Sequence, residues 1–457
     1  MISRGRAFAG LASTVALLAL LGGPVTATAA TLNVSFGAAR ATPTYGEGIA
    51  FTQDVDLASV PRRVELEVTF PGGPGAFLIE VPAPSAAGSQ ELRYEYNVLT
   101  DGHILPNTRL SARWVVTFGP PGSPVIETSE PVSILYRDTR FQWRTREGAI
   151  VRVHWYEGDD GFGRRALDIG ERAVRETAEL LGVEERQPID FFIYADERSF
   201  REALGPGTRE NVGGQANAEI RTLFALVRPA EIDQAWVGTV IPHELVHLVF
   251  DTAANNPYHF PPKWLNEGLA VYLSQGVERA DRDALEAAAR NGELMPLDAL
   301  TGNFPTTFDR FSLAYAESAS AVDFLVREHG RDALVGLIRS YANGMTDDQA
   351  FNQAIGLDVA AFDAAWRAGL GAAEPAAHGP RPAPSGPVPP GWDAPGAVSS
   401  APAASASSPA GSSAPPVIPT GSGQSDDTGA LIPLGVLAGA LLTLLVLRRV
   451  RAGGPPS

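Results

Sequence analysis

Two of the chain's 7 histidines stand four positions apart, with a glutamate beside the first, in the stretch IPHELVHLVF over residues 241–250. Positions four apart share one face of a helix, so the imidazoles of His243 and His247 can point at one metal ion. Glu244 would then lie near a water on that ion and could act as a general base. This spacing indicates a metal-dependent hydrolase.

The same stretch could instead be an ordinary buried helix with one polar notch, because Leu245, Val246 and Leu248 suit a core. Two imidazoles and a carboxylate are costly to bury without partners, which favours the metal site. We expect the helix to begin after Thr239 as its N-cap. Pro242 would then lie in the first turn, where a missing N–H costs nothing.

A second segment offers a third ligand. The stretch PPKWLNEGLAVYLSQG, residues 261–276, has apolar residues at helical spacing. On such a helix the charged carboxylate of Glu267 would be unfavourable without a binding partner. It follows His247 by 20 positions, enough chain for a pair of helices to bring it to the metal. Two histidines and one glutamate leave a fourth position open for water, as a hydrolytic site requires. The chain has 0 cysteines, so any metal must bind through His, Asp or Glu.

His243, Glu244, His247 and Glu267 match the HExxH…E signature of the gluzincin superfamily of zinc metallopeptidases, which the chain resembles most specifically between residues 240 and 272. WLNEGLA is similar to the third-ligand segment of the aminopeptidase branch, and LAYAESASAVDFLVREHG is similar to exported bacterial members. The resemblance implies one zinc ion per chain and a peptide or protein substrate. It also implies hydrolysis by a zinc-activated water, with Glu244 taking the proton.

The chain departs from the superfamily in ways that limit the assignment. In the aminopeptidases, a Gly-Ala-Met-Glu-Asn segment before the motif binds the free amine of the substrate. The corresponding region here reads NVGGQANAEIRTLFALV and has no such segment. We therefore expect an endopeptidase. Val271 stands where thermolysin-like enzymes carry an aspartate that orients a ligand imidazole, so another partner must hold the histidine. Members of the superfamily commonly use a Tyr or His to donate a hydrogen bond to the oxyanion. Tyr315 is the candidate for this role, and a packing role for it is equally open. His259 and His329 are weaker candidates.

The surrounding elements indicate an α+β protein with two folded domains. Residues 31–137 alternate apolar and polar side chains between Gly/Pro turns, as in VELEVTF, which predicts an antiparallel β-sandwich of immunoglobulin-like architecture. Residues 138–371 have strands first and helices after. The resemblance implies a thermolysin/gluzincin-like metallopeptidase domain there, with a small sheet and a mostly helical C-terminal part. The strand RTLFALV could be the sheet edge that pairs with an extended peptide, or an ordinary strand.

Both ends of the chain indicate export and membrane attachment. Residues 1–30 have arginines, an apolar stretch and then small residues, the order of a secretory signal peptide, with an uncleaved anchor as the alternative. Residues 372–429 are rich in Pro, Ala, Ser and Gly and predict a disordered stalk. An apolar run at 430–447 followed by a basic tail at 448–457 predicts a transmembrane helix with a cytoplasmic tail, unless a sorting enzyme removes it. We therefore expect a single-pass protein of the cell membrane with its catalytic body extracytoplasmic.

The net charge of −16 argues against a nucleic-acid partner, because phosphate binding needs a basic surface. Two other functions stay open. One is a cell-surface binding or adhesion protein in which the peptidase-like part is a catalytically inert scaffold, and the other is a zinc hydrolase that acts on something other than peptides. Glu244 favours the enzyme, because a scaffold has no need of a base.

Overall fold

The computed structural model describes residues 33–372, except residues 74, 207–212 and 257–258. The predicted signal peptide at 1–30, the transmembrane helix at 430–447 and the basic tail lie outside the described residues, as does the predicted stalk beyond residue 372. Within the described part of the chain, no helix is long and apolar enough to cross a membrane.

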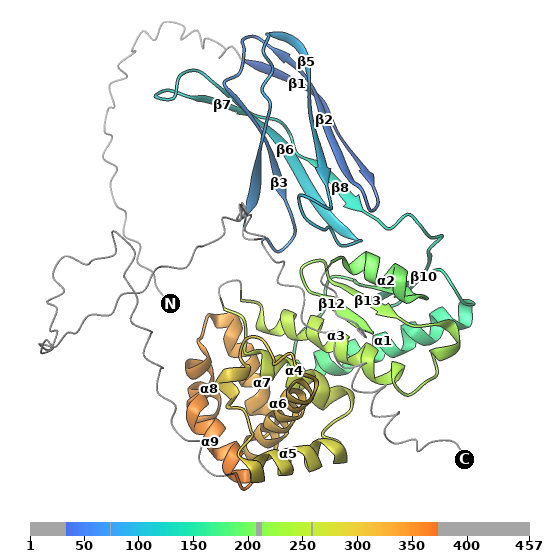
Figure 1. Cartoon of the computed structure of the whole chain (residues 1–457), viewed down its shortest axis with the longest axis vertical. Coiled ribbons are helices and arrows are strands. Elements are labelled where there is room, and N and C mark those ends of the chain that lie inside the picture. Colours follow the sequence, from blue (N-terminus) through green and yellow to red (C-terminus); the bar gives the residue numbers. More distant parts are fainter. Residues whose placement is uncertain (1–32, 74, 207–212, 257–258, 373–457) are drawn as a thin grey trace, which may run out of the picture. The chain divides into compact units, whose positions relative to one another are not determined.

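The first of two compact units, residues 33–102 with 109–135, consists of two antiparallel sheets. One sheet has the strand order β1-β2-β5, and the other has the order β4-β3-β6-β7 with β8 also paired to β6 (Figure 1). Val64, Leu66 and Val68 of the predicted strand VELEVTF are buried, at most 1% exposed. The strands are β1 Val34–Thr44, β2 Gly48–Leu57, β3 Arg63–Thr69, β4 Ala76–Val81, β5 Gly88–Asn97, β6 Thr108–Phe118, β7 Val125–Thr128 and β8 Val132–Tyr136.

The second unit, residues 103–108 with 136–372, is built on a mixed five-stranded sheet of order β12-β13-β11-β10-β9. The stretch RTLFALV is not the edge of this sheet: its strand β13 lies between β11 and β12, and the edge strand is β12, from the stretch GQAN. A short polar strand has no hydrophobic alternation from which the sequence could predict it. The strands are β9 Arg144–Glu147, β10 Val151–Trp155, β11 Ile189–Tyr194, β12 Gly214–Asn217 and β13 Thr222–Leu226.

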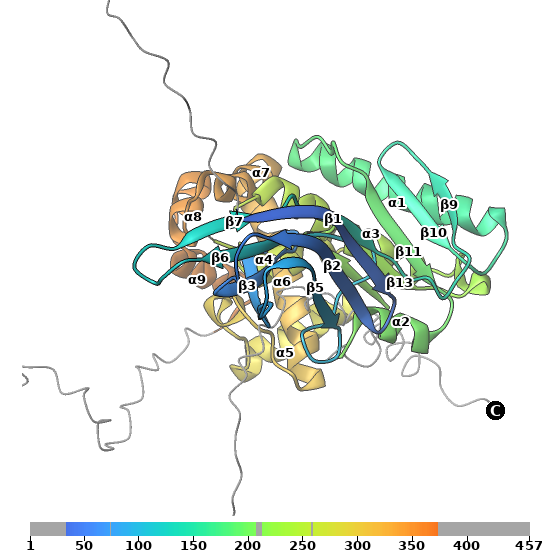
Figure 2. The ribbon, with the colours of Figure 1, turned by 90° about the horizontal axis from the view of Figure 1, so that it is seen from above.

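Helices cover both faces of this sheet. α1 (Asp160–Leu181) and α3 (Val237–Ala254) pack on one face, over a core that includes Phe191 (Figures 1 and 2). α2 (Glu197–Leu204) packs on the other face, in an aromatic core that includes Phe224. The face that carries α3 is therefore the one that presents the predicted metal-binding motif.

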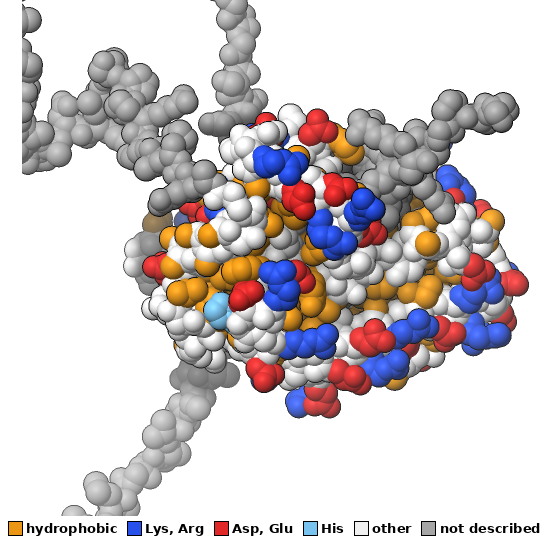
Figure 3. Space-filling view, turned by 90° about the horizontal axis from the view of Figure 1, so that it is seen from below, with side chains coloured by type: hydrophobic (Ala, Val, Ile, Leu, Met, Phe, Trp, Pro, Cys, Tyr) orange, Lys and Arg blue, Asp and Glu red, His pale blue; other side chains and the backbone are white. Residues whose placement is uncertain are grey.

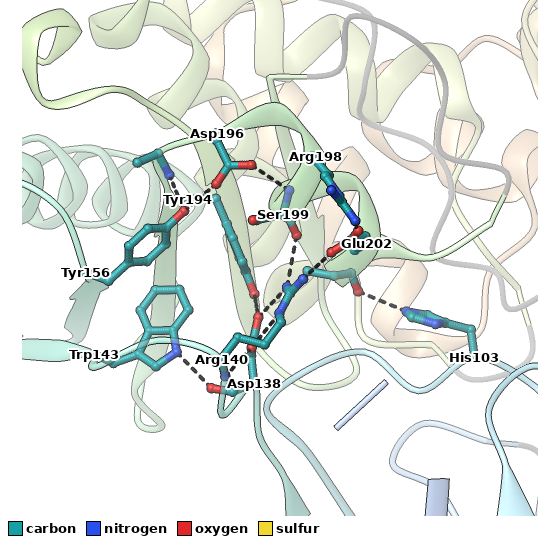
Figure 4. Close-up of polar contacts among 12 residues, drawn as sticks. His103, Asp138, Arg140, Trp143, Tyr156, Tyr194, Asp196, Arg198, Ser199 and Glu202 are labelled. Carbon is teal, nitrogen blue, oxygen red and sulfur yellow. Dashed lines mark hydrogen bonds and ion pairs between the residues drawn. The ribbon is translucent and has the colours of Figure 1, made fainter. Parts of the chain in front are cut away.

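The short segment 103–108 belongs to the second unit although it lies between two strands of the first. His103 Nε2 lies 2.9 Å from the backbone oxygen of Ala203 (Figure 4), and burial lowers the pKa of this histidine. The side-chain amide of Asn107 donates to Asp190 Oδ2 at 2.9 Å. The boundary predicted from the sequence, at residue 137, would place this segment in the first domain. Its packing places it in the second unit.

Asp138 anchors the start of the continuous part of the second unit. Its Oδ2 accepts a hydrogen bond from the Tyr194 hydroxyl at 3.0 Å, and its Oδ1 accepts one from the Arg140 backbone N–H at 3.0 Å (Figure 4). The indole of Trp143 donates to the Asp138 carbonyl at 2.9 Å. These bonds attach residues 138–143 to the aromatic face of the sheet.

The helices after the sheet include a closely packed pair, α4 and α6. A Cβ on Gly268 of α4 would lie 2.4 Å from the backbone oxygen of Ser318 in α6, so no larger residue fits there without moving a backbone. This contact holds the turn of α4 that carries Glu267. The helices are η1 Pro229–Glu231, α4 Lys263–Ser274, α5 Arg279–Asn291, η2 Leu297–Leu300, α6 Phe308–His329, α7 Arg331–Ser340, η3 Tyr341–Asn343, α8 Asp347–Ile355 and α9 Val359–Gly369.

Charged side chains of both signs are interspersed on the face shown in Figure 3, with apolar side chains between them. Such mixing keeps a surface soluble without giving it a single-signed field.

Candidate metal centre

Three side chains from α3 and α4 converge on one point. His243 Nε2 lies 3.3 Å from His247 Nε2, and the Oε2 atom of Glu267 lies 3.5 Å and 3.7 Å from these two nitrogens. Donor atoms on a tetrahedral zinc ion at about 2.0–2.2 Å lie roughly 3.3–3.6 Å from one another. The three donors are therefore spaced as the corners of a zinc coordination shell, and the residues fit the ion.

The local sequence explains this convergence. His243 and His247 lie one turn apart on α3, and α4 packs directly against α3 with Glu267 buried, 2% exposed. The expected start of α3 is wrong by a few residues, because the helix begins at Val237 with Trp236 as N-cap. Thr239 lies inside the helix and donates its hydroxyl to the Ala235 carbonyl at 3.4 Å. A turn that begins at Gln234 leads directly into the helix, so Pro242 lies beyond the first turn.

Asn266 is the partner that orients a ligand histidine in place of the absent aspartate at Val271. Its Oδ1 atom lies 2.8 Å from His247 Nδ1 and accepts that ring's N–H. With the proton on Nδ1, the lone pair of Nε2 points at the other donors, as a metal ligand requires. Asn266 lies directly before Glu267, so the WLNEGLA segment supplies both a ligand and a support, which the motif alone did not indicate.

Replacing Asn266 with alanine is expected to lower zinc affinity about 10- to 100-fold, the usual cost of removing a hydrogen-bonding support from a ligand. The measurement is a chelator competition at fixed pH on the purified protein. Asn352→Ala, at an exposed position of α8, is the matched control and should leave the affinity as it was. Equal zinc affinity in the two variants would remove Asn266 from the site.

Glu244 lies beside the donors and is held by the edge strand β12. Its Oε2 accepts a hydrogen bond from the Ala216 backbone N–H at 3.1 Å. A Cβ on Gly214 would lie 2.9 Å from Glu244 Cγ, so the strand can approach this closely only because that residue is glycine. Burial, and then the charge of Glu267, raise the pKa of Glu244 well above its usual value. The side chain is thus fixed through one oxygen and made more basic.

The electrostatics of the ligands suit a metal. Burial lowers the pKa of His247 to about 4, so this imidazole is neutral at physiological pH. Burial by itself would raise the pKa of Glu267, but the neighbouring His243 and His247 hold it below its usual value. A neutral imidazole and an ionised carboxylate are the protonation states in which these side chains bind zinc.

Tyr315 lies near this group, whereas the two weaker histidine candidates make other contacts. The ring of Tyr315 is 6.5 Å from the ring of His243, and the residue is 3% exposed, packed against Phe304 and Phe311. His259 pairs with Asp347 in α8, Nε2 to Oδ1 at 2.9 Å. His329 is exposed in the last turn of α6.

Comparisons with known proteins agree with this geometry. Residues 170–372, which contain α3, α4 and α6, match the model of the peptidase MA superfamily. This part of the chain is similar to members of the peptidase MA superfamily. This match, together with two imidazoles and one carboxylate as donors, supports zinc as the metal of this centre.

Among curated proteins, the chain is similar to aminopeptidase M1-D of Oryza sativa subsp. japonica, with 25% identity over 255 residues. The match takes in 50% of this chain and 27% of that relative, so the chain spans about a quarter of the relative's length.

Two solved structures are also similar. The M1 zinc metallopeptidase of Deinococcus radiodurans has 16% identity and a TM-score of 0.36, covering 72% of this chain and 93% of that one. An aminopeptidase N family protein of Idiomarina loihiensis has 11% identity and a TM-score of 0.37, covering 72% and 75%.

Proposed function

We propose that the chain is a membrane-anchored, extracytoplasmic zinc metallopeptidase that cleaves within peptide chains. The observation that carries the proposal is the place of Glu244: a buried carboxylate held by Ala216 beside the three donors. A metal site that served only as structure would need a fourth ligand and no base. The chain instead combines three donors with a positioned base, as hydrolysis requires.

In this proposal the chain's own residues hold the reactants and move one proton. Zinc, when bound, supplies a Lewis acid that acidifies water and polarises the scissile carbonyl. The Ala216 N–H holds Glu244 Oε2, which leaves Oε1 to accept the water's proton and to deliver it to the leaving nitrogen. Tyr315 is the proposed donor to the developing oxyanion, because its ring lies next to that of His243.

The substrate would bind as an extended peptide along the open side of β12. This strand is the last of the five-stranded sheet, and the backbone of Ala216 already lies against the catalytic glutamate. Backbone hydrogen bonds from an edge strand bind a peptide with little regard to its side chains. This arrangement supports cleavage inside a chain, because it does not require a free amino terminus.

The remaining parts of the proposal rest on the sequence. The apolar run at 430–447, the Pro/Ala/Ser-rich stretch at 372–429 and the leader at 1–30 support a protein that is exported and tethered by its C-terminal helix. For the first unit, the two antiparallel sheets support an immunoglobulin-like sandwich, and for the second unit, the zinc motif on α3 supports a thermolysin/gluzincin-like architecture.

The test is zinc analysis combined with digestion of a diverse peptide library by the purified protein. One zinc per chain and cleavage at internal bonds are expected. Glu267→Ala, which removes one of the three donors, should lose both the metal and the cleavage. Parent protein that carries zinc but cleaves no peptide would support an inert scaffold or a different substrate class, and a parent without zinc would exclude the metal site altogether.

A further inference from the structure

Lys263 is the single lysine of the chain; the other basic residues among its 36 are all arginine. It is the first residue of α4, the helix that carries Glu267. A protein that uses arginine at every other basic position has a compact ammonium group here and a planar guanidinium elsewhere. The two groups differ in size, hydration and hydrogen-bond geometry, so they are not interchangeable at a binding site.

The position of Lys263 on α4 places it beside the metal centre. Residues three and four positions apart share a helix face, so Lys263 shares its face with Asn266, which supports His247, and with Glu267. Its backbone N–H donates to the Thr301 carbonyl at 2.9 Å. The residue is half-buried.

The ammonium group of Lys263 lies at one end of a row of aromatic rings, and the other end of the row lies next to His243. Lys263 Nζ lies 4.7 Å from the centroid of the Phe304 ring. The Phe304 ring packs edge-on against Tyr315 at 5.3 Å, and the Tyr315 ring lies 6.5 Å from that of His243. A cation–π contact with a buried ring holds the ammonium group in one place.

A lysine at this position works against the helix itself. A positive charge in the first turn opposes the helix dipole, and Lys four residues before Glu is the less favourable order of that pair. Within the centre, the carboxylates Glu244 and Glu267 balance the charge of a divalent ion when both are ionised. The charge of Lys263 acts on both His247 and Glu267, so it adds a positive charge beside the centre, which favours an anionic ligand.

We propose that Lys263 binds a carboxylate group of the substrate, so that the centre prefers peptides with an acidic side chain or a free C-terminal carboxylate near the scissile bond. This inference rests on the proposed peptidase function and specifies its substrate class. The carboxylate would approach along the first turn of α4, next to Phe304 and within reach of the metal centre.

The kinetic test compares peptides that differ only in charge, using the full-length chain. One pair has Glu or Gln at each position around the cleaved bond, and the other pair has a free or an amidated C terminus. Hydrogen bonds to charged groups contribute enough for the parent protein to favour the carboxylate member of one pair by about 10- to 100-fold in kcat/KM. Lys263→Met should abolish this preference and Lys263→Arg should retain part of it. Arg279→Met, at an exposed position on α5, is the control and should retain the whole preference.

A second measurement reports binding without catalysis. Reductive methylation with ¹³C-formaldehyde labels the α-amine and one lysine, so the Lys263 signal can be observed alone and is identified by its absence from Lys263→Arg. The experiment uses the Glu244→Gln chain and two probe pairs: N-acetylglutamate amide with N-acetylglutamine amide, and N-acetylalanine with N-acetylalanine amide. The signal should shift with one of the acids and with neither neutral partner, and the acid that shifts it identifies the source of the carboxylate.

The two measurements separate the two proposals. A shifted Lys263 signal in the Glu244→Gln chain, together with a parent protein that hydrolyses no peptide, would overturn the peptidase assignment and retain the anion site. Hydrolysis with the same charge preference in the parent and in Lys263→Met, or a Lys263 signal that neither acid moves, would overturn the role of Lys263 and leave the peptidase intact.

Discussion

Glu244→Gln is expected to retain one zinc per chain and to abolish peptide hydrolysis. Glu244 is not one of the three converging donors, so the metal should stay. Glutamine has nearly the same shape and could still accept the Ala216 N–H bond, but its amide cannot accept a proton from water. Zinc content and kcat on the best library peptide are the measurements. A variant as active as the parent protein would remove Glu244 from the mechanism.

A second variant tests the same step without touching Glu244. Gly214→Ala places a Cβ about 2.9 Å from Glu244 Cγ, so the glutamate or the edge strand must move. A displacement of about 1 Å at a catalytic group can cost on the order of 10²-fold in rate. Gly238→Ala on α3 is the matched control, because a Cβ there meets nothing within 4 Å. Zinc should be retained in both variants, and equal rates would mean that β12 does not position the base.

Tyr315→Phe is expected to lower kcat by about 10²-fold or more, with KM and zinc content little changed. The reason is that a donor to the oxyanion acts only in the transition state, so its loss leaves substrate binding intact. The ring of Tyr315 lies 6.5 Å from that of His243.

The control for Tyr315 is Tyr341→Phe, which removes the hydroxyl of another buried tyrosine. That hydroxyl donates to Asp347 at 3.0 Å, so its loss should lower stability and leave kcat as it was. If Tyr315→Phe also has the kinetics of the parent protein, Tyr315 only packs against Phe304 and Phe311.

The sequence by itself determined which residues could form the centre and which helices carry them. The four-residue spacing of His243 and His247 places two imidazoles on one face of any helix, and Glu267 stands out as a carboxylate within an apolar helical pattern. The period-two alternation of VELEVTF in the same way predicted a buried strand face. Such inferences depend on geometry that repeats within a few residues of chain.

Only the tertiary structure decided which groups support these residues. The Ala216 N–H and Gly214 contact Glu244 from a strand almost thirty positions earlier in the chain. Asn266 on α4 contacts His247 on α3. Residues 103–108 pack with the second unit. The same holds for β12, which replaces RTLFALV at the edge of the sheet. None of these contacts has a local period, because each depends on how separate elements pack. A side chain's neighbours across a packed interface are set by the fold as a whole and not by the residues next to it in the chain.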